Sequence, residues 1–279
     1  MGPGQWLEAS LVLAMLVATA GDAFAQAEAP PSPSVDCQAP APPPRPVAPL
    51  VRDARHVRAQ PRPAGLVANE TEGLEGLLAH AAAGAMDRPL ILRRLAEDYV
   101  ELESRAAQEQ APTVAHAWRQ KAIRMYTTLR DEVPAYAALD EVLYYLGYAY
   151  ELDGDPANAR RVQYTLIQSR PSSRYIPLAY LSFAELFFNE GAQDPSKWTI
   201  AEQAYEKVVS FPPPDNHAYG YAWFKLAHVY WRHGQAAKAR AAFQKARSWG
   251  QAYPQEPAAL SVSQAAGSDL ARLQAVCPP

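Results

Sequence analysis

The fold is decided by the stretch Leu143–Pro171, which reads LYYLGYAYELDGDPANARRVQYTLIQSRP. It places five tyrosines among 29 residues, turns acidic at ELDGD, and then continues as a polar pattern with helical spacing. Residues 221–246, YAWFKLAHVYWRHGQAAKARAAFQKA, repeat this arrangement. Gly154 in the first copy corresponds to Gly234 in the second, where one helical pattern gives way to the next. The chain therefore repeats a unit of two helices joined by a turn.

Two more divergent copies complete the series. One joins LAYLSFAELFFNEG at 178–191 to WTIAEQAYEKVVSFPP at 198–213, and the other joins LRRLAEDYVELE at 92–103 to KAIRMYTTLRDEVP at 121–134. No run alternates polar and apolar residues for long enough to predict a strand. The sequence therefore predicts an all-α protein. The second helices share an alanine, at spacings of 37, 42 and 38 residues, in Ala122, Ala159, Ala201 and Ala239.

These residues resemble the tetratricopeptide repeat family. The likeness consists of a Leu-Gly/Ala-x-x-Tyr/Phe helix, a glycine turn, an Ala-x-x-x-Tyr/Phe helix and a closing proline, over about residues 89–250. The resemblance implies a right-handed solenoid of about four helical hairpins with a concave side. The expected units are 89–134, 140–171, 177–213 and 220–250, with an extra N-terminal helix from about Asn69 and a capping helix at 257–275.

Departures from the repeat pattern lead to further expectations. The first unit has an overlong gap between its helices, and the third carries an insertion at 190–197. Gln163 stands where the other units have Tyr or Phe, so we expect the second unit to be looser there. We expect the capping helix to be interrupted or weakened at Gly267-Ser268, because glycine disfavours helix.

The first 63 residues predict export followed by a spacer. The apolar run Leu11–Ala20 is too short to span a bilayer and is followed by a small-x-small site, Ala23-Phe24-Ala25. We therefore interpret 1–27 as a signal peptide, although its first ten residues contain no Lys or Arg. Residues 28–63 hold eleven prolines and are interpreted as a disordered, semi-rigid polyproline linker. The helical domain is expected at 64–279.

The sequence contains two cysteines, Cys37 in the linker and Cys277 near the other end. In an oxidising compartment the two can form one disulfide. Their positions in the sequence neither favour nor forbid the bridge.

The sequence of the repeats contains no recognisable motif of catalytic or metal-binding residues. Asp153-Gly154-Asp155 lacks the alternating oxygen ligands and final Glu of a calcium loop, so we interpret it as a turn in which Asp155 caps the next helix. His228 and His233 are five residues apart, off the i, i+4 spacing of paired ligands, and are interpreted as surface histidines. The net charge of −3 gives no basic character for binding nucleic acid. We expect no enzyme activity, no cofactor, no metal and no integral membrane span.

A binding role remains. In the family, the first helix of each unit lines the concave groove, so the resemblance implies that the first helices carry the binding residues. Aromatic side chains dominate this set, and aromatic side chains anchor many interfaces. The alternative is that several of them pack between repeats or under the terminal helices. The expected groove residues are Tyr144, Tyr148, Leu181, Glu185, Phe188, Tyr221, Phe224, His228, Trp231 and Arg232.

Two hypotheses for function follow. The first is a non-enzymatic scaffold or adaptor that binds a protein or peptide partner in the periplasm or outer envelope of a bacterium. The segment RRLAEDYVELE, with the signal, the linker and the long inserts, looks like exported tetratricopeptide proteins of myxobacteria, some of which serve gliding motility or Tol–Pal-type assemblies. The alternative is a self-associating structural envelope component, linked to peptidoglycan, whose groove is filled by its own helices. A homo-oligomer is compatible with both hypotheses.

Overall fold

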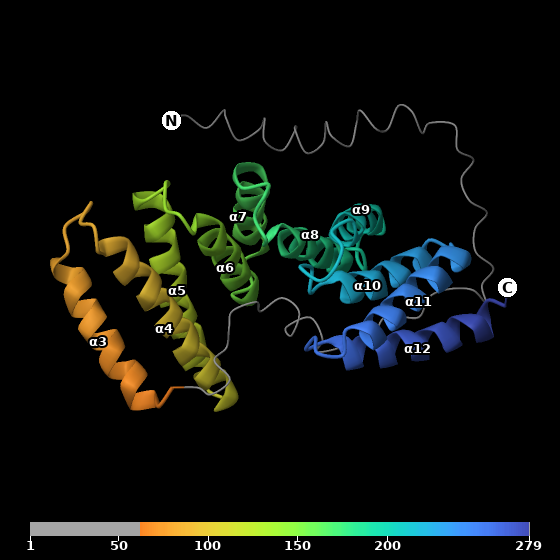
Figure 1. Cartoon of the computed structure of the whole chain (residues 1–279), viewed down its shortest axis with the longest axis horizontal. Coiled ribbons are helices and arrows are strands. Elements are labelled where there is room, and N and C mark those ends of the chain that lie inside the picture. The colour runs from red at the N-terminus through yellow and green to blue at the C-terminus, as the bar shows by residue number, and fades with distance from the viewer. Residues whose placement is uncertain (1–61, 279) are drawn as a thin grey trace.

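The structure is a computed structural model that describes residues 62–278, so the expected signal peptide and nearly all of the linker lie outside the described residues. The described chain is all helical, as the sequence predicts. Figure 1 shows the helices in a row, with α3 at one end and α12 at the other. The helices are α3 (Ala64–His80), α4 (Arg88–Gln108), α5 (Pro112–Glu132), α6 (Leu139–Leu152), α7 (Pro156–Ser169), α8 (Ile176–Glu190), α9 (Lys197–Val209), α10 (Tyr219–Arg232), α11 (Ala236–Ala252) and α12 (Ala259–Val276).

Each helix packs against the next along the chain, from α3 on α4 to α11 on α12. Beyond these neighbours, α6 also contacts α8 and α10 contacts α12. Among the described helices no two second helices, such as α7 and α9, come into comparable contact. These contacts between alternate helices therefore all lie on one set of helices, to which α6, α8, α10 and α12 belong. We call the side formed by α4, α6, α8, α10 and α12 the inner face.

Three of the inter-helix turns share one backbone geometry. Gly154 and Gly234 have φ of 77° and 70°, the left-handed conformation expected of them. Gln110 occupies the same position between α4 and α5, with φ of 57°. In all three turns the N–H of the following residue donates to the carbonyl five residues earlier, at 2.8–2.9 Å, the pattern that ends many helices. The repeat register is therefore preserved in a turn that lacks glycine.

The acidic turn of the opening stretch is a helix start, as predicted. The Asp155 carboxylate accepts a hydrogen bond from the backbone N–H of Asn158 at 3.0 Å. Pro156 follows at the first helical position, where no backbone donor is needed.

Three sequence expectations about helix boundaries differ from the structure. The first pair has no overlong gap, because α4 and α5 each extend to 21 residues and only three residues separate them. Pro112 begins α5 and thereby fixes the boundary. The end helix α12 is uninterrupted through Gly267. Glycine costs a helix only about 1 kcal/mol, and the buried Ala266 and Leu270 beside it offset that cost. The first helix also begins at Ala64, five residues before Asn69.

The second pair is closely packed at Gln163, so the expectation of a looser unit is wrong. Gln163 is fully buried on α7 and lies opposite Gly147 on α6. A Cβ atom on Gly147 would come within 2.5 Å of the Gln163 amide nitrogen. Glycine on one helix therefore accommodates a larger side chain on the other.

Candidate protein-binding face

All ten predicted groove residues lie on first helices of the array, but they are not prominent on an open surface. Nine of them are no more than 7% exposed, and Arg232 is half-buried. These side chains are therefore buried, and their role in binding a partner stays a prediction. Tyr144 and Tyr148 are on α6, Leu181, Glu185 and Phe188 are on α8, and Tyr221, Phe224, His228, Trp231 and Arg232 are on α10.

Three tyrosine rings, two of them on α6, form a continuous stack. The ring of Tyr144 lies parallel to that of Tyr148, with 6.4 Å between centroids. Its other stacked neighbour is Tyr175, at 5.1 Å. Tyr175 immediately precedes α8, so the stack joins the second helix pair to the third. Such contacts add modestly to the energy of burial and fix the relative position of the two units.

A buried carboxylate organises the middle of the inner face. Glu185 on α8 accepts hydrogen bonds from the hydroxyl groups of Tyr205 on α9 and Tyr221 on α10. The ammonium group of Lys225 on α10 lies 3.3 Å from the same carboxylate and 3.5 Å from the centroid of the Phe188 ring. A buried charge needs such partners, because an isolated carboxylate out of water is costly. The cluster therefore couples the third pair to the fourth.

On α10, aromatic rings surround a histidine that bonds to the last helix. His228 contacts Phe224 edge to face at 4.8 Å and Phe243 of α11 at 5.1 Å. Its Nε2 lies 3.1 Å from Asp269 Oδ2 on α12. Burial lowers the pKa of His228, while Asp269 opposes that shift. The prediction of a surface histidine is therefore wrong for His228, which is 1% exposed. Its ring instead makes a polar contact between helices, with Asp269 on α12.

Arg232 ends the helix beside an indole ring. Its guanidinium carbon lies 4.4 Å from the centroid of the Trp198 ring, which comes from α9. Burial lowers the pKa of Arg232. Arg232 and Trp198 therefore form a cation–π contact, because the planar guanidinium group packs well on a flat aromatic ring.

The contacts described above involve residues of α6, α8, α10 and α12. We call their aromatic residues, Tyr144, Tyr148, Phe188, Tyr221, Phe224 and Trp231, the inner strip. Sequence reasoning missed Lys225 and Asp269, since each acquires its role from a partner on another helix. Within residues 62–278, no group of three or more His, Cys, Asp or Glu side chains is arranged to hold a metal ion. None of the helices in that range combines the length and apolar character needed to cross a bilayer.

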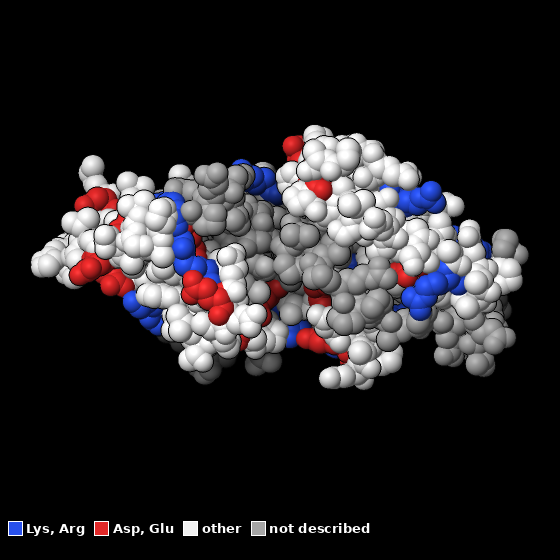
Figure 2. All heavy atoms as spheres, turned by 90° about the horizontal axis from the view of Figure 1, so that it is seen from below, with Lys and Arg blue, Asp and Glu red and all other residues white. Residues whose placement is uncertain are grey.

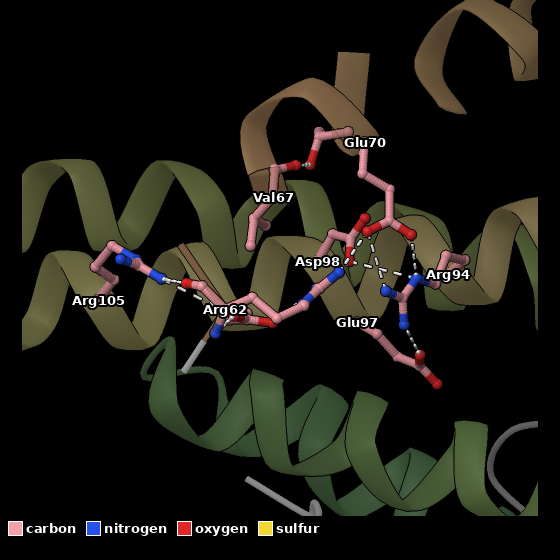
Figure 3. A network of polar contacts seen from close by, with 9 residues as sticks. Arg62, Val67, Glu70, Arg94, Glu97, Asp98 and Arg105 are labelled. Carbon is pink, nitrogen blue, oxygen red and sulfur yellow. Dashed lines mark hydrogen bonds and ion pairs between the residues drawn. The ribbon is translucent and has the colours of Figure 1, made fainter. Parts of the chain in front are cut away.

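A second polar cluster fixes the first described residue to the α3 end of the array (Figure 3). The guanidinium group of Arg62 bonds to Asp98 at 2.6 Å and to Glu101 at 2.7 Å, and it also bonds to Glu70. Arg105 donates in turn to the Arg62 carbonyl. Asp98 is fully buried, and burial raises its pKa against the opposing effect of Arg62. The chain therefore enters the helical array at a fixed point.

Charges of both signs occur on the face shown in Figure 2. On the side of the molecule seen in Figure 2, acidic and basic side chains alternate among uncharged residues and do not gather into a patch of one sign. A basic patch is the usual footprint of a protein that binds nucleic acid through phosphates.

The fold and the inner face together define the class of this protein. It is an all-helical array of sequentially packed helix pairs, consistent with a helical repeat protein. No protein-family model matches the chain, and no curated protein matches it.

Cys277 closes α12 and is disulfide-bonded. Cys37, the other cysteine of the sequence, lies outside the described residues, so their pairing stays a prediction.

Proposed function

We propose that this chain is a non-enzymatic scaffold of tetratricopeptide type that binds a protein partner across its inner face in the bacterial cell envelope. The observation that carries the proposal is the inner strip, which consists of aromatic side chains on three first helices, α6, α8 and α10. An enzyme gathers its reactive groups at one site. Aromatic side chains that are spread over several repeats suit an extended protein partner instead.

The location in the envelope draws on two further features. The apolar run Leu11–Ala20 with Ala23-Phe24-Ala25 has the pattern of a cleaved export signal. The disulfide at Cys277 suits an oxidising compartment, because reducing systems in the cytosol keep most thiols free.

Site-specific photo-crosslinking in the native host tests the proposal. A photoreactive phenylalanine analogue replaces Tyr148 or Tyr221 on the inner face, and Tyr164 on α7 serves as the control position on a second helix. We expect crosslinks to a second protein from the two inner positions and none from the control. Binding of that protein, purified, should weaken in Tyr148→Ala while the helical content stays unchanged.

Two outcomes would contradict the proposal. Equal crosslinking from Tyr164 and the inner positions would show that the inner face has no special role. Crosslinked products with only twice the mass of the chain would favour the self-associating structural component. Cell fractionation, with sequencing of the mature N-terminus, tests the envelope location. An unprocessed cytosolic chain would overturn it.

A further inference from the structure

The two ends of the helical array differ in the outer surface that they present. Repeat arrays stay soluble because their terminal helices carry polar outer faces. At one end, α12 follows this rule, since Gln264, Ser268 and Arg272 are among its exposed residues. At the other end, α3 is the outermost of the described helices (Figure 1) but does not follow it. Of the eight large apolar side chains that are exposed among the described residues, half lie in α3, in the loop after it or at the start of α4, namely Leu66, Leu77, Met86 and Leu90.

The outward face of α3 has small residues at its centre. The buried residues of this helix are Val67 and Thr71, and with 3.6 residues per turn the opposite side centres near Gly76. A Cβ atom on Gly73 or Gly76 would meet no other part of the chain within 4 Å. The packing of this chain therefore does not require glycine at these positions, where glycine is unfavourable for a helix. A second helix that crosses α3 at close range would require it.

Two exposed polar side chains on this face lie at matched distances from Gly76. Glu72 is four residues before it and His80 is four residues after it, about 6 Å along the helix axis in each direction. Glu70 and Glu75 form ion pairs within the chain, whereas Glu72 forms none with another described residue. Two copies of α3 that cross at Gly76 in antiparallel directions would place Glu72 of each copy opposite His80 of the other. The face is therefore complementary to itself in charge as well as in shape.

A second copy of the chain fits this face better than other occupants do. The helix α3 contains three glutamates and no Lys or Arg, whereas helices that lie on anionic membranes carry basic residues on their polar face. Stacking of α12 on α3 in a head-to-tail manner would cover apolar side chains with Gln264 and Ser268. A contact between two α3 helices instead joins identical surfaces, and a two-fold contact of this kind closes at two subunits.

We infer that two copies of this chain associate through the outward faces of α3, in antiparallel directions and with the crossing at Gly76. This arrangement also brings the loop that carries Met86 in one subunit beside the start of α3, with Leu66, in the other. The helix α3 is not part of the inner face, so the contact is separate from the binding face proposed above.

Sedimentation equilibrium of the purified full chain over a wide range of concentrations tests the inference. We expect a reversible equilibrium between the chain mass of 30.6 kDa and twice that mass. Gly76→Gln should weaken the association about tenfold or more, because a long side chain at the crossing keeps the two helices apart. Gly267→Gln on α12 is the matched control, since Gly267 is also helical and its Cβ would lie 4.0 Å from Arg247 Cδ. The control should leave the association unchanged.

Charge exchange tests the antiparallel crossing. His80→Glu places a glutamate opposite Glu72 at two symmetric points of the dimer, so it should weaken the association about tenfold. Adding Glu72→Lys to the same chain should restore the association, because each lysine then faces a glutamate of the other subunit. Both positions are exposed, so these replacements leave the packing of the monomer intact. Circular dichroism and thermal unfolding in dilute samples check that all variants are folded.

Several results would overturn the inference. The first is a chain that remains a monomer at the highest concentration reached. A dimer that Gly76→Gln does not weaken, or that Gly267→Gln weakens equally, would place the contact elsewhere. Failure of Glu72→Lys to restore the association would exclude the antiparallel crossing.

Two other outcomes would assign α3 to a different occupant. Masses that grow beyond the dimer would indicate open, head-to-tail assembly. Co-sedimentation with vesicles of phosphatidylethanolamine and phosphatidylglycerol, lost in Gly76→Gln, would assign the face to a lipid surface. These measurements contain no partner protein, so their failure contradicts this inference and leaves the proposed function standing.

Discussion

His228 on α10 and Asp269 on α12 form a hydrogen bond of 3.1 Å between side chains that are 1% and 0% exposed. The pair joins the last helix pair to the end helix across 41 residues of sequence. The contribution of this pair to stability depends on whether His228 is protonated. Its imidazole is enclosed by Phe224, Phe243 and Trp231, and burial among apolar rings disfavours the charged form.

The first prediction concerns pH. Burial lowers the pKa of His228 from its usual 6.5, so below that pH the unfolded chain binds a proton that the folded chain does not. Stability from this group is therefore full above pH 6.5 and is lost as the pH falls. We expect the free energy of unfolding to drop below pH 6.5 by up to about 1.4 kcal/mol per pH unit. Urea titrations at several pH values measure it. His228→Gln should flatten the dependence, and an unchanged profile in that variant would contradict the assignment.

The second prediction concerns the turn between α4 and α5. Gln110 has φ of 57°, where glycine is favoured, and Gly154 and Gly234 occupy the same position in other turns. Gln110→Gly should therefore raise the free energy of unfolding by about 0.5–1 kcal/mol. Gly154→Ala is the reciprocal control and should lower it by about 1 kcal/mol. Thermal and urea unfolding measure both changes. Destabilisation by Gln110→Gly would show that its side chain contributes more than the turn strain costs.

The third prediction concerns the Arg62 cluster. Asp98 is fully buried, and removing Arg62 leaves it with Arg94 at 3.6 Å as its remaining cation. Arg62→Ala should therefore destabilise the chain by about 2–4 kcal/mol, as expected when one member of a buried ion pair is removed. Arg160→Ala, which breaks the half-buried pair with Glu190 near the surface, should cost less than about 1 kcal/mol. Equal effects in the two variants would contradict a buried role for Arg62. Urea unfolding at pH 7 provides the comparison.

The fourth prediction concerns the crossing of α6 and α7. A Cβ on Gly147 would overlap the buried amide of Gln163, so Gly147→Ala should destabilise by about 1–3 kcal/mol. Gln163→Ala should remove the overlap and rescue the alanine at 147. A double-mutant cycle measures this coupling, for which we expect about 1 kcal/mol or more. Additive effects would mean that the two residues are not the point of closest approach.

Much of the fold was open to prediction from local patterns. Helical periodicity identified each pair, Gly154 and Gly234 located two turns, and Asp155 with Pro156 located a helix start. The errors arose where a weak local signal was outweighed. Gly267 did not interrupt α12, because the burial of neighbouring side chains exceeds the helical cost of one glycine.

The sequence predicted which helices carry the candidate site residues, but it did not predict how these residues are buried and paired. First-helix spacing placed Tyr148, Phe224 and Trp231 on first helices, and they lie on α6 and α10. The burial of His228 and the Lys225–Glu185 pair could not be predicted, because their partners come from helices that are distant in sequence.

The sequence by itself determined that this protein is helical and where its helix pairs lie. Those properties follow from steric and hydrogen-bonding preferences that act within one or two turns of helix. Only the tertiary structure decided which polar groups are buried together. That choice brings Arg62 to Asp98 and His228 to Asp269, across 36 and 41 residues, because a buried charge or imidazole is stable only where another element supplies its partner.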